Sequence, residues 1–121
     1  RILEIAALTH DIGIRNSEQK FGNCSGVHQQ EEGPPEARIL LTGIGVEERV
    51  IERVCWLIAH HHTYANIRGM DYQILVEADF LVNAFEDEMD EDAIRTVQEK
   101  LFCTKTGKEL LKNLYLSARN A

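Results

Sequence analysis

Apolar residues recur along the chain at helical spacing, and no segment shows the strict alternation that a half-buried strand requires. Residues 1–10 are largely apolar and predict the end of a buried helix, after which Gly13 permits a tight turn. Five further helices are expected, over residues 34 to about 42, 46–62, 71–87, 90–102 and about 106–118. The pattern therefore predicts an all-α protein, folded as a compact bundle of about six helices.

Residues 14–33 differ from the rest because they are rich in Gly, Ser, Asn and Gln. This composition predicts a long loop, with room for one helical turn near residues 16–21. The next helix is expected to begin at Pro34–Pro35, because a proline lacks only an N–H that the first helical turn does not use. Loops of this length in a compact domain are often functional.

The helix expected over residues 46–62 ends in three consecutive histidines. Val54, Leu57 and His61 share one face of this helix with Val50, so His61 continues the core-facing stripe and His60 and His62 flank it. A buried imidazole needs a partner, because an unsatisfied buried polar group costs roughly 1–3 kcal/mol. The partner is either a metal ion or a backbone carbonyl. The third interpretation is that the three histidines lie on the surface at the end of the helix.

Residues 74–85, within the helix expected over residues 71–87, form an apolar stretch that contains two carboxylates. Asp79 lies within it, and a buried carboxylate is normally paired or bound to a metal. The alternative for Asp79 is an ion pair with Arg53 or Arg38, whereas Glu77 is interpreted as solvent-facing. Residues 86–93 are expected to form an acidic turn that leads into a helix N-terminus. The apolar face is assigned to Ile74, Leu75, Ala78, Leu81, Val82 and Phe85.

Composition narrows the classes of protein that this chain can represent. Its 121 residues, with 44% hydrophobic content, fit one soluble domain over residues 1–121. The net charge of −7 argues against binding to the phosphates of a nucleic acid. No apolar run approaches the roughly 18–20 residues of a membrane span. Three cysteines without a CxxC motif are typical of reduced thiols in a cytoplasmic protein. The sequence does not indicate an oligomeric state.

His10 and Asp11 stand side by side at the end of the first apolar segment. Together with His61 and Asp79 they would form a mixed nitrogen and oxygen ligand set, which suits Mn, Fe, Ni, Zn or Mg. A divalent ion in such a site lowers the pKa of bound water and neutralises phosphate oxygens. A small phosphorylated substrate is therefore compatible with the negative net charge, because the cation inverts the local field.

The motifs THDIG, HHHTY and EADFLVN, spread over about residues 1–87, resemble the HD-domain metal-dependent phosphohydrolases. The resemblance implies an HD-like all-α fold with one or two divalent ions. It further implies hydrolysis of a phosphomonoester or phosphodiester, nucleotide-like in character, by metal-bound hydroxide, with His10 and Asp11 as the catalytic pair. The metal ligands that it implies are His10, Asp11 as a possible bridge, Asp79 as the final aspartate, His61 with His60 or His62 beside it, and His28.

The chain departs from that family pattern at several positions. The family's first histidine lies on a helix upstream of the HD pair, and no histidine precedes His10. We expect an N-terminally truncated domain, the alternative being a copy that has lost this ligand. Ile14 stands where the cyclic-dinucleotide phosphodiesterase branch prefers Lys, and no GYP follows the histidines, so that branch is disfavoured.

Two other functional readings stay open beside the phosphohydrolase. One is a non-catalytic nucleotide- or metal-binding sensor or interaction module on the HD scaffold. The other is a purely structural helical domain in which His10 and His61 are satisfied by hydrogen bonds. Lys20 and Arg15 are candidate contacts to substrate phosphate, with solvated surface charges as the alternative, and Glu32 is an alternative oxygen ligand.

Overall fold

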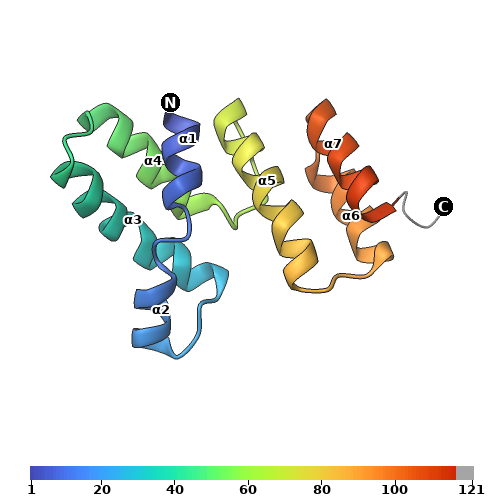
Figure 1. Ribbon diagram of the computed structural model, residues 1–121, viewed down its shortest axis with the longest axis horizontal. Coiled ribbons are helices and arrows are strands. Elements are labelled where there is room, and N and C mark those ends of the chain that lie inside the picture. Colours follow the sequence, from blue (N-terminus) through green and yellow to red (C-terminus); the bar gives the residue numbers. More distant parts are fainter. Residues whose placement is uncertain (117–121) are drawn as a thin grey trace. The chain divides into compact units, whose positions relative to one another are not determined.

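The computed structural model describes residues 1–116, which divide between two compact units, one over Arg1–Ala65 and one that begins at Asn66. Every regular element within residues 1–116 is helical, which confirms the all-α class (Figure 1). None of the helices in this described part is both long enough and apolar enough to cross a membrane. The single domain expected over residues 1–121 stays a prediction, and each unit is described separately.

The first unit is built around the longest pair of helices in its half of the chain. It contains α1 (Ile2–Thr9), α2 (Ile14–Phe21), α3 (Gly26–Gly43) and α4 (Glu48–His60). Helix α4 packs along α3 and also contacts α1, while α2 packs on α3 (Figure 1). The predicted inward stripe of α4 is confirmed, because its apolar members and the histidine that continues it are all buried: Val50, Val54, Leu57 and His61.

The helical turn expected near residues 16–21 is confirmed as part of α2, but the long loop predicted over residues 14–33 is wrong, because α2 and the start of α3 occupy most of it. Ser25 caps α3 by accepting a hydrogen bond from the backbone N–H of His28, and Gly22 ends α2 in the left-handed conformation at φ 74°. Pro34 and Pro35 lie inside α3 rather than at its start. Each removes a helical hydrogen bond, a loss that packing against α4 offsets.

Gly13 is required for a reason other than a tight turn. Its φ of −80° is open to any residue, but a Cβ there would lie 2.6 Å from the backbone nitrogen of Gly33. A Cβ on Gly33 would in turn lie 2.6 Å from Cγ2 of Ile58 on α4. The two glycines therefore bring the segment after Asp11 against α3, and α3 against α4.

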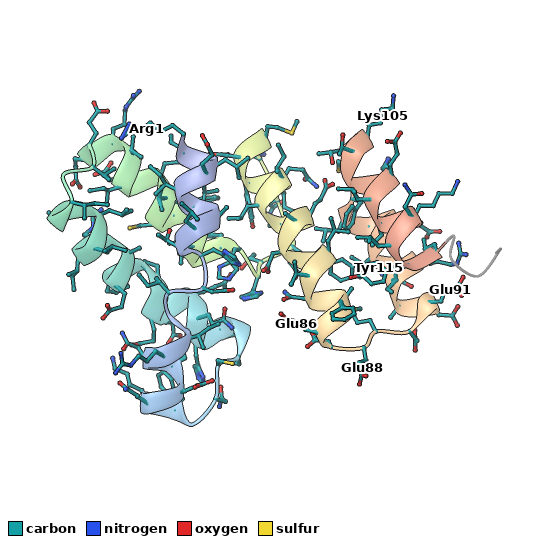
Figure 2. The ribbon with its side chains drawn as sticks, in the orientation of Figure 1. Arg1, Glu86, Glu88, Glu91, Lys105 and Tyr115 are labelled. Carbon is teal, nitrogen blue, oxygen red and sulfur yellow. The ribbon has the colours of Figure 1, made fainter. Side chains whose placement is uncertain are left out.

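The second unit contains α5 (Met70–Glu86), α6 (Glu91–Leu101), α7 (Lys105–Leu111) and the π-helical segment η1 (Lys112–Leu116). The predicted acidic turn is confirmed: Asp90 caps α6 by accepting from the N–H of Ala93 at 2.8 Å. Figure 2 shows Glu86, Glu88 and Glu91 around this connection. Residues 117–118 of the last expected helix lie outside the described residues.

The buried face of α5 differs from the face assigned from the sequence. Leu75 of the assigned face is buried, but Val82 and Phe85 are 57% and 76% exposed, whereas Tyr72 and Val76 are buried. The helix is apolar on most of its circumference, so hydropathy alone does not choose the face that packs. In the structure, α7 contacts α5, and the side of α5 that carries Glu77 lies next to the start of α7.

Glu77 is buried rather than solvent-facing, with only 2% of its surface exposed. Its Oε2 accepts hydrogen bonds from Nε2 of Gln73 at 2.6 Å and from the backbone N–H groups of Cys103 and Thr104 at 3.0 and 3.1 Å. Its Oε1 accepts from the Thr104 hydroxyl at 2.6 Å. A Cβ on Gly107 would lie 2.0 Å from that oxygen. Glu77 therefore ties the entry of α7 to α5.

Candidate metal centre

Helices α1 and α4 end beside one another in the first unit, and their C-terminal residues meet at Asp11. Oδ1 of Asp11 lies 3.2 Å from Nε2 of His10 and 4.0 Å from Nε2 of His61. The ring centroids of the two histidines are 5.3 Å apart. The HD pair and the middle residue of the triple histidine thus share one cluster, although Asp11 and His61 are 50 positions apart in the sequence.

The backbone fixes which nitrogen of each ring carries a proton. Nδ1 of His10 lies 2.8 Å from the carbonyl oxygen of Ala7, and Nδ1 of His61 lies 2.6 Å from that of Ile58. A carbonyl oxygen only accepts, so each Nδ1 donates, and in the neutral ring Nε2 then carries the lone pair. Two nitrogen lone pairs and a carboxylate oxygen converge, and such a set is stabilised by a cation or a shared proton.

The electrostatics of the cluster keep Asp11 ionised. The largest influence is the hydrogen bond that Nε2 of His10 donates to the carboxylate when the imidazole is protonated; it lowers the pKa of the Asp11 carboxyl, with smaller contributions from the charges of His10, His61 and His62. Partial burial opposes this shift. His61 is fully buried, whereas the Asp11 side chain is 52% exposed. The cluster therefore has a rigid buried side and a side that solvent or substrate reaches.

His62 adds a third imidazole to the cluster, and His60 points elsewhere. The rings of His61 and His62 have centroids 3.9 Å apart. The His60 ring stacks on Trp56 at 4.0 Å, and its Nδ1 lies 2.7 Å from the Trp56 carbonyl oxygen. Of the two alternatives for the histidine beside His61, the structure favours His62. A ligand role for His60 stays a prediction.

His28 and the proposed phosphate contacts lie on α2 and α3. Nδ1 of His28 lies 2.8 Å from Oδ1 of Asn23, and its ring stacks on Phe21 at 3.8 Å. Among residues 1–116, neither His28 nor His60 belongs to a group of three potential ligands within 4.8 Å of one another. Lys20 pairs with Glu32 at 2.9 Å. The roles of His28, Lys20, Glu32 and the exposed Arg15 stay predictions.

Asp79 lies in the second unit, on α5, and it is buried. Its Oδ2 accepts a hydrogen bond from Nδ2 of Asn83 at 3.1 Å. The two arginines considered as ion-pair partners have contacts in the first unit: Arg38 pairs with Glu48 at 2.6 Å, and the Arg53 guanidinium lies 4.6 Å from the Trp56 ring centroid. The part of Asp79 as the final metal ligand stays a prediction from the sequence.

Sequence reasoning missed two residues that position the histidines, Gln29 and Gln30. Gln29 contacts the His62 ring, and Gln30 accepts from the backbone N–H of His62 at 2.9 Å. Both fall in the segment read as a loop, where no side chain has an assigned direction. The helical signal available there was Ser25, which caps a helix whose first turns carry both glutamines.

No protein-family model, curated protein or solved structure matches the chain. The resemblance to the HD-domain phosphohydrolases therefore rests on the motif residues alone.

Proposed function

We propose that this protein is a metal-dependent phosphohydrolase in which His10, Asp11 and His61 hold a divalent cation. One observation carries the proposal: backbone carbonyls of Ala7 and Ile58 hold Nδ1 of the two histidines, so both Nε2 atoms face Oδ1 of Asp11. Metal-ligating histidines characteristically donate their second ring N–H to such a carbonyl or carboxylate.

The residues present fit a borderline divalent ion. Two imidazoles and one carboxylate suit Mn²⁺, Fe²⁺, Ni²⁺ or Zn²⁺, and Mg²⁺ with more of its coordination left to water. An ion bound here would lower the pKa of a coordinated water and neutralise phosphate oxygens. Under the HD resemblance, Asp79 is the predicted final ligand, and the substrate is a phosphomonoester or phosphodiester of nucleotide-like character.

His61 and Asp11 would have different roles in such a site, because they differ in solvent exposure. His61 is fully buried and hydrogen-bonded to the end of its helix, so its ring has one orientation. Asp11 is half-exposed and ionised, so it offers its carboxylate to an ion that substrate can still approach. This division is typical of a catalytic metal site, which keeps a coordination position open.

Metal binding is the first test, and Asp11→Asn is the sharpest variant because it keeps the shape of the side chain. The protein purified without chelator is analysed for bound metals, and Mn²⁺ affinity is then measured by equilibrium dialysis. Loss of a direct ligand is expected to weaken Mn²⁺ binding by more than about 100-fold, since outer partners alone are worth roughly 10–100-fold. Asp87→Asn, an exposed aspartate at the end of α5, is the matched control and is expected to bind normally. Equal Mn²⁺ binding by both variants contradicts the proposal.

Activity is the second test, and it separates an enzyme from a binding module. The Mn²⁺-loaded protein is incubated with bis(p-nitrophenyl) phosphate, a generic phosphodiester, and with p-nitrophenyl phosphate. If the protein is a phosphohydrolase, we expect the wild type to turn over these compounds. This turnover should be lost in Asp11→Asn and retained in Asp87→Asn. Metal binding at His10, Asp11 and His61 without turnover of either compound or of any nucleotide would instead identify a non-catalytic module.

A further inference from the structure

Helix α5 carries a second apolar face besides the one that packs within its unit. Met70, Ile74 and Phe85 follow one another along it at helical spacing and are 64%, 37% and 76% exposed. Leu110 of α7 and Leu114 of η1, which lie beside this face, are 44% and 58% exposed. Single exposed apolar side chains are ordinary, but a contiguous row of them marks a site of interaction.

These side chains line one groove between α5 and the segment formed by α7 and η1. The hollow at one end is lined by Ile74, Leu81 and Leu110. The hollow at the other end is lined by Leu81, Phe85 and Leu114, so Leu81 joins the two. The groove therefore follows most of the 17 residues of α5, a helix about 25 Å long, and has room for a second helix of that length.

The two ends of the groove carry opposite charges. Lys105 lines the first hollow and Glu86 lines the second, and Figure 2 shows these two labelled side chains at opposite ends of the pair formed by α5 and α7. Glu77 also lines the first hollow, but it is buried and its carboxylate already accepts four hydrogen bonds. The groove thus has an apolar middle between a cationic end and an anionic end.

This pattern is complementary to itself. A two-fold axis that crosses the groove sets two copies antiparallel, so that Lys105 of each copy faces Glu86 of the other and the apolar middles meet. An axis along the groove would instead place like charges opposite one another. Two chains that each carry a net charge of −7 repel each other, so association requires a face on which opposite charges meet. The groove provides such a face.

We propose that this groove is the interface of a homodimer, in which a second copy of the chain packs antiparallel through α5 and α7. The proposal is independent of the metal site, because every residue that carries it belongs to the second unit. It also gives α5 a reason to be apolar on most of its circumference. One face packs within the unit, and the exposed face with Phe85 is buried between the two copies.

Sedimentation equilibrium of the full chain, over roughly 1–500 µM, is the first test. We expect the wild type to dimerise and Phe85→Asp to weaken the dimer by more than about 30-fold, because an interface anchor is lost twice across a two-fold axis. Ile39→Asp is the matched control, since Ile39 is 68% exposed on α3 of the first unit, and it should dimerise like wild type. Both substituted positions are exposed in the single chain, so circular dichroism should show both variants folded.

The charged ends test the antiparallel arrangement. Lys105→Glu and Glu86→Lys each set like charges opposite one another and should weaken the dimer roughly 10-fold. The double variant restores opposite charges with their positions exchanged, so it should dimerise like wild type. A double variant that loses the product of the two single effects would overturn the antiparallel arrangement.

The Cys103 thiol gives an independent readout, because it is exposed in the single chain and lines the groove beside Lys105. A second copy in the groove would cover it. Its alkylation by iodoacetamide should therefore be fast in dilute protein and slow down as the protein concentration rises, whereas Phe85→Asp should react fast at every concentration. A wild-type rate that does not change with concentration would contradict the proposal.

Two further outcomes overturn the proposal and leave the metal site untouched. One is a wild type that stays monomeric over the whole concentration range, and the other is a Phe85→Asp variant that dimerises as tightly as Ile39→Asp. If such a monomer binds the apolar dye ANS and Phe85→Asp does not, the groove takes an apolar ligand rather than a second copy.

Discussion

Asp11 and Glu77 are carboxylates of the first and the second unit, one in the turn after α1 and the other within α5, and their surroundings are opposite. Glu77 is 2% exposed and receives four hydrogen bonds, two of them from backbone N–H groups. The Asp11 side chain is 52% exposed and faces the Nε2 atoms of His10 and His61. Glu77 is surrounded by hydrogen-bond donors, whereas Asp11 is surrounded by imidazole nitrogens that are acceptors when the rings are neutral.

The difference shows how to recognise a structural carboxylate and a ligand carboxylate. A carboxylate whose lone-pair sites are filled by fixed donors is satisfied without an ion and contributes to folding. A carboxylate that meets imidazole lone pairs is stabilised by a cation or a proton between them. Substitutions at Glu77 should therefore affect stability, and substitutions at Asp11 should affect metal binding.

The largest effect on stability is expected from Glu77→Ala. The change leaves the buried Gln73 amide and the N–H groups of Cys103 and Thr104 without their acceptor, and each unmade buried hydrogen bond costs roughly 1–3 kcal/mol. We expect the free energy of unfolding in urea to fall by at least about 3 kcal/mol. Glu86→Ala, at the exposed end of the same helix, should stay within about 0.5 kcal/mol of wild type. Equal stabilities for the two variants would refute the structural role.

Gly13→Ala is expected to have the next largest effect, and it should change both stability and metal binding. The new Cβ would meet the backbone of Gly33 at 2.6 Å, so the segment after Asp11 must move away from α3. We expect a loss of about 1–3 kcal/mol in unfolding free energy together with weaker Mn²⁺ binding. Gly43→Ala is the control, because no atom lies within 4 Å of its Cβ position. A Gly13→Ala variant as stable as Gly43→Ala would show that the close approach does not matter.

Asp11→Asn should have little effect on the stability of the metal-free protein. The side chain is half-exposed, and its contact with His10 joins adjacent residues, so we expect a change of less than about 1 kcal/mol. The same variant loses Mn²⁺, so added metal should raise the melting temperature of wild type and not that of Asp11→Asn. A loss as large as that of Glu77→Ala in the absence of metal would make Asp11 a structural carboxylate as well.

The smallest effect concerns the thiols, which report on each unit separately. Burial raises the pKa of the Cys55 thiol, whose Sγ lies 3.5 Å from the Pro34 carbonyl oxygen, whereas Cys103 is exposed beside Glu77. Iodoacetamide should therefore alkylate Cys103 first and Cys55 last, as followed by mass spectrometry. Glu77→Ala should speed reaction at Cys103, and Asp11→Asn should change neither rate. Rapid alkylation of Cys55 in the native wild type would contradict the packing of α3 on α4.

Sequence reasoning located the helices wherever one face was clearly apolar. The stripe of α4 was assigned correctly because Val50, Val54 and Leu57 alternate with polar residues at helical spacing. On α5 the same reasoning chose the wrong face, because apolar residues occupy most of its circumference and tertiary contacts decide which side is buried. Glu77 was misread for this reason: its partners are Cys103 and Thr104, which lie 26 and 27 positions later in the chain, and Gln73, four positions earlier on its own helix.

In the candidate site, too, some residues are visible in the sequence and others depend on tertiary contacts. Adjacent His10 and Asp11, and the placement of His61 on an inward stripe, are visible in the sequence, and the structure brings these three together. The choice between His60 and His62 depends on ring directions, which follow from contacts with Trp56 and Gln29 rather than from helical spacing. Gln29 was missed because a segment rich in Gly, Ser, Asn and Gln reads as a loop, although Ser25 caps a helix there.

Anomalous diffraction from crystals equilibrated with Mn²⁺ is the most direct measurement of the central claim. We expect one strong peak at about 2.0–2.3 Å from Nε2 of His10, Nε2 of His61 and a carboxylate oxygen of Asp11. Crystals of Asp11→Asn should lack this peak, and crystals of Asp87→Asn should retain it. Wild-type crystals in which these three side chains contact only one another and water, at millimolar Mn²⁺, would contradict the account.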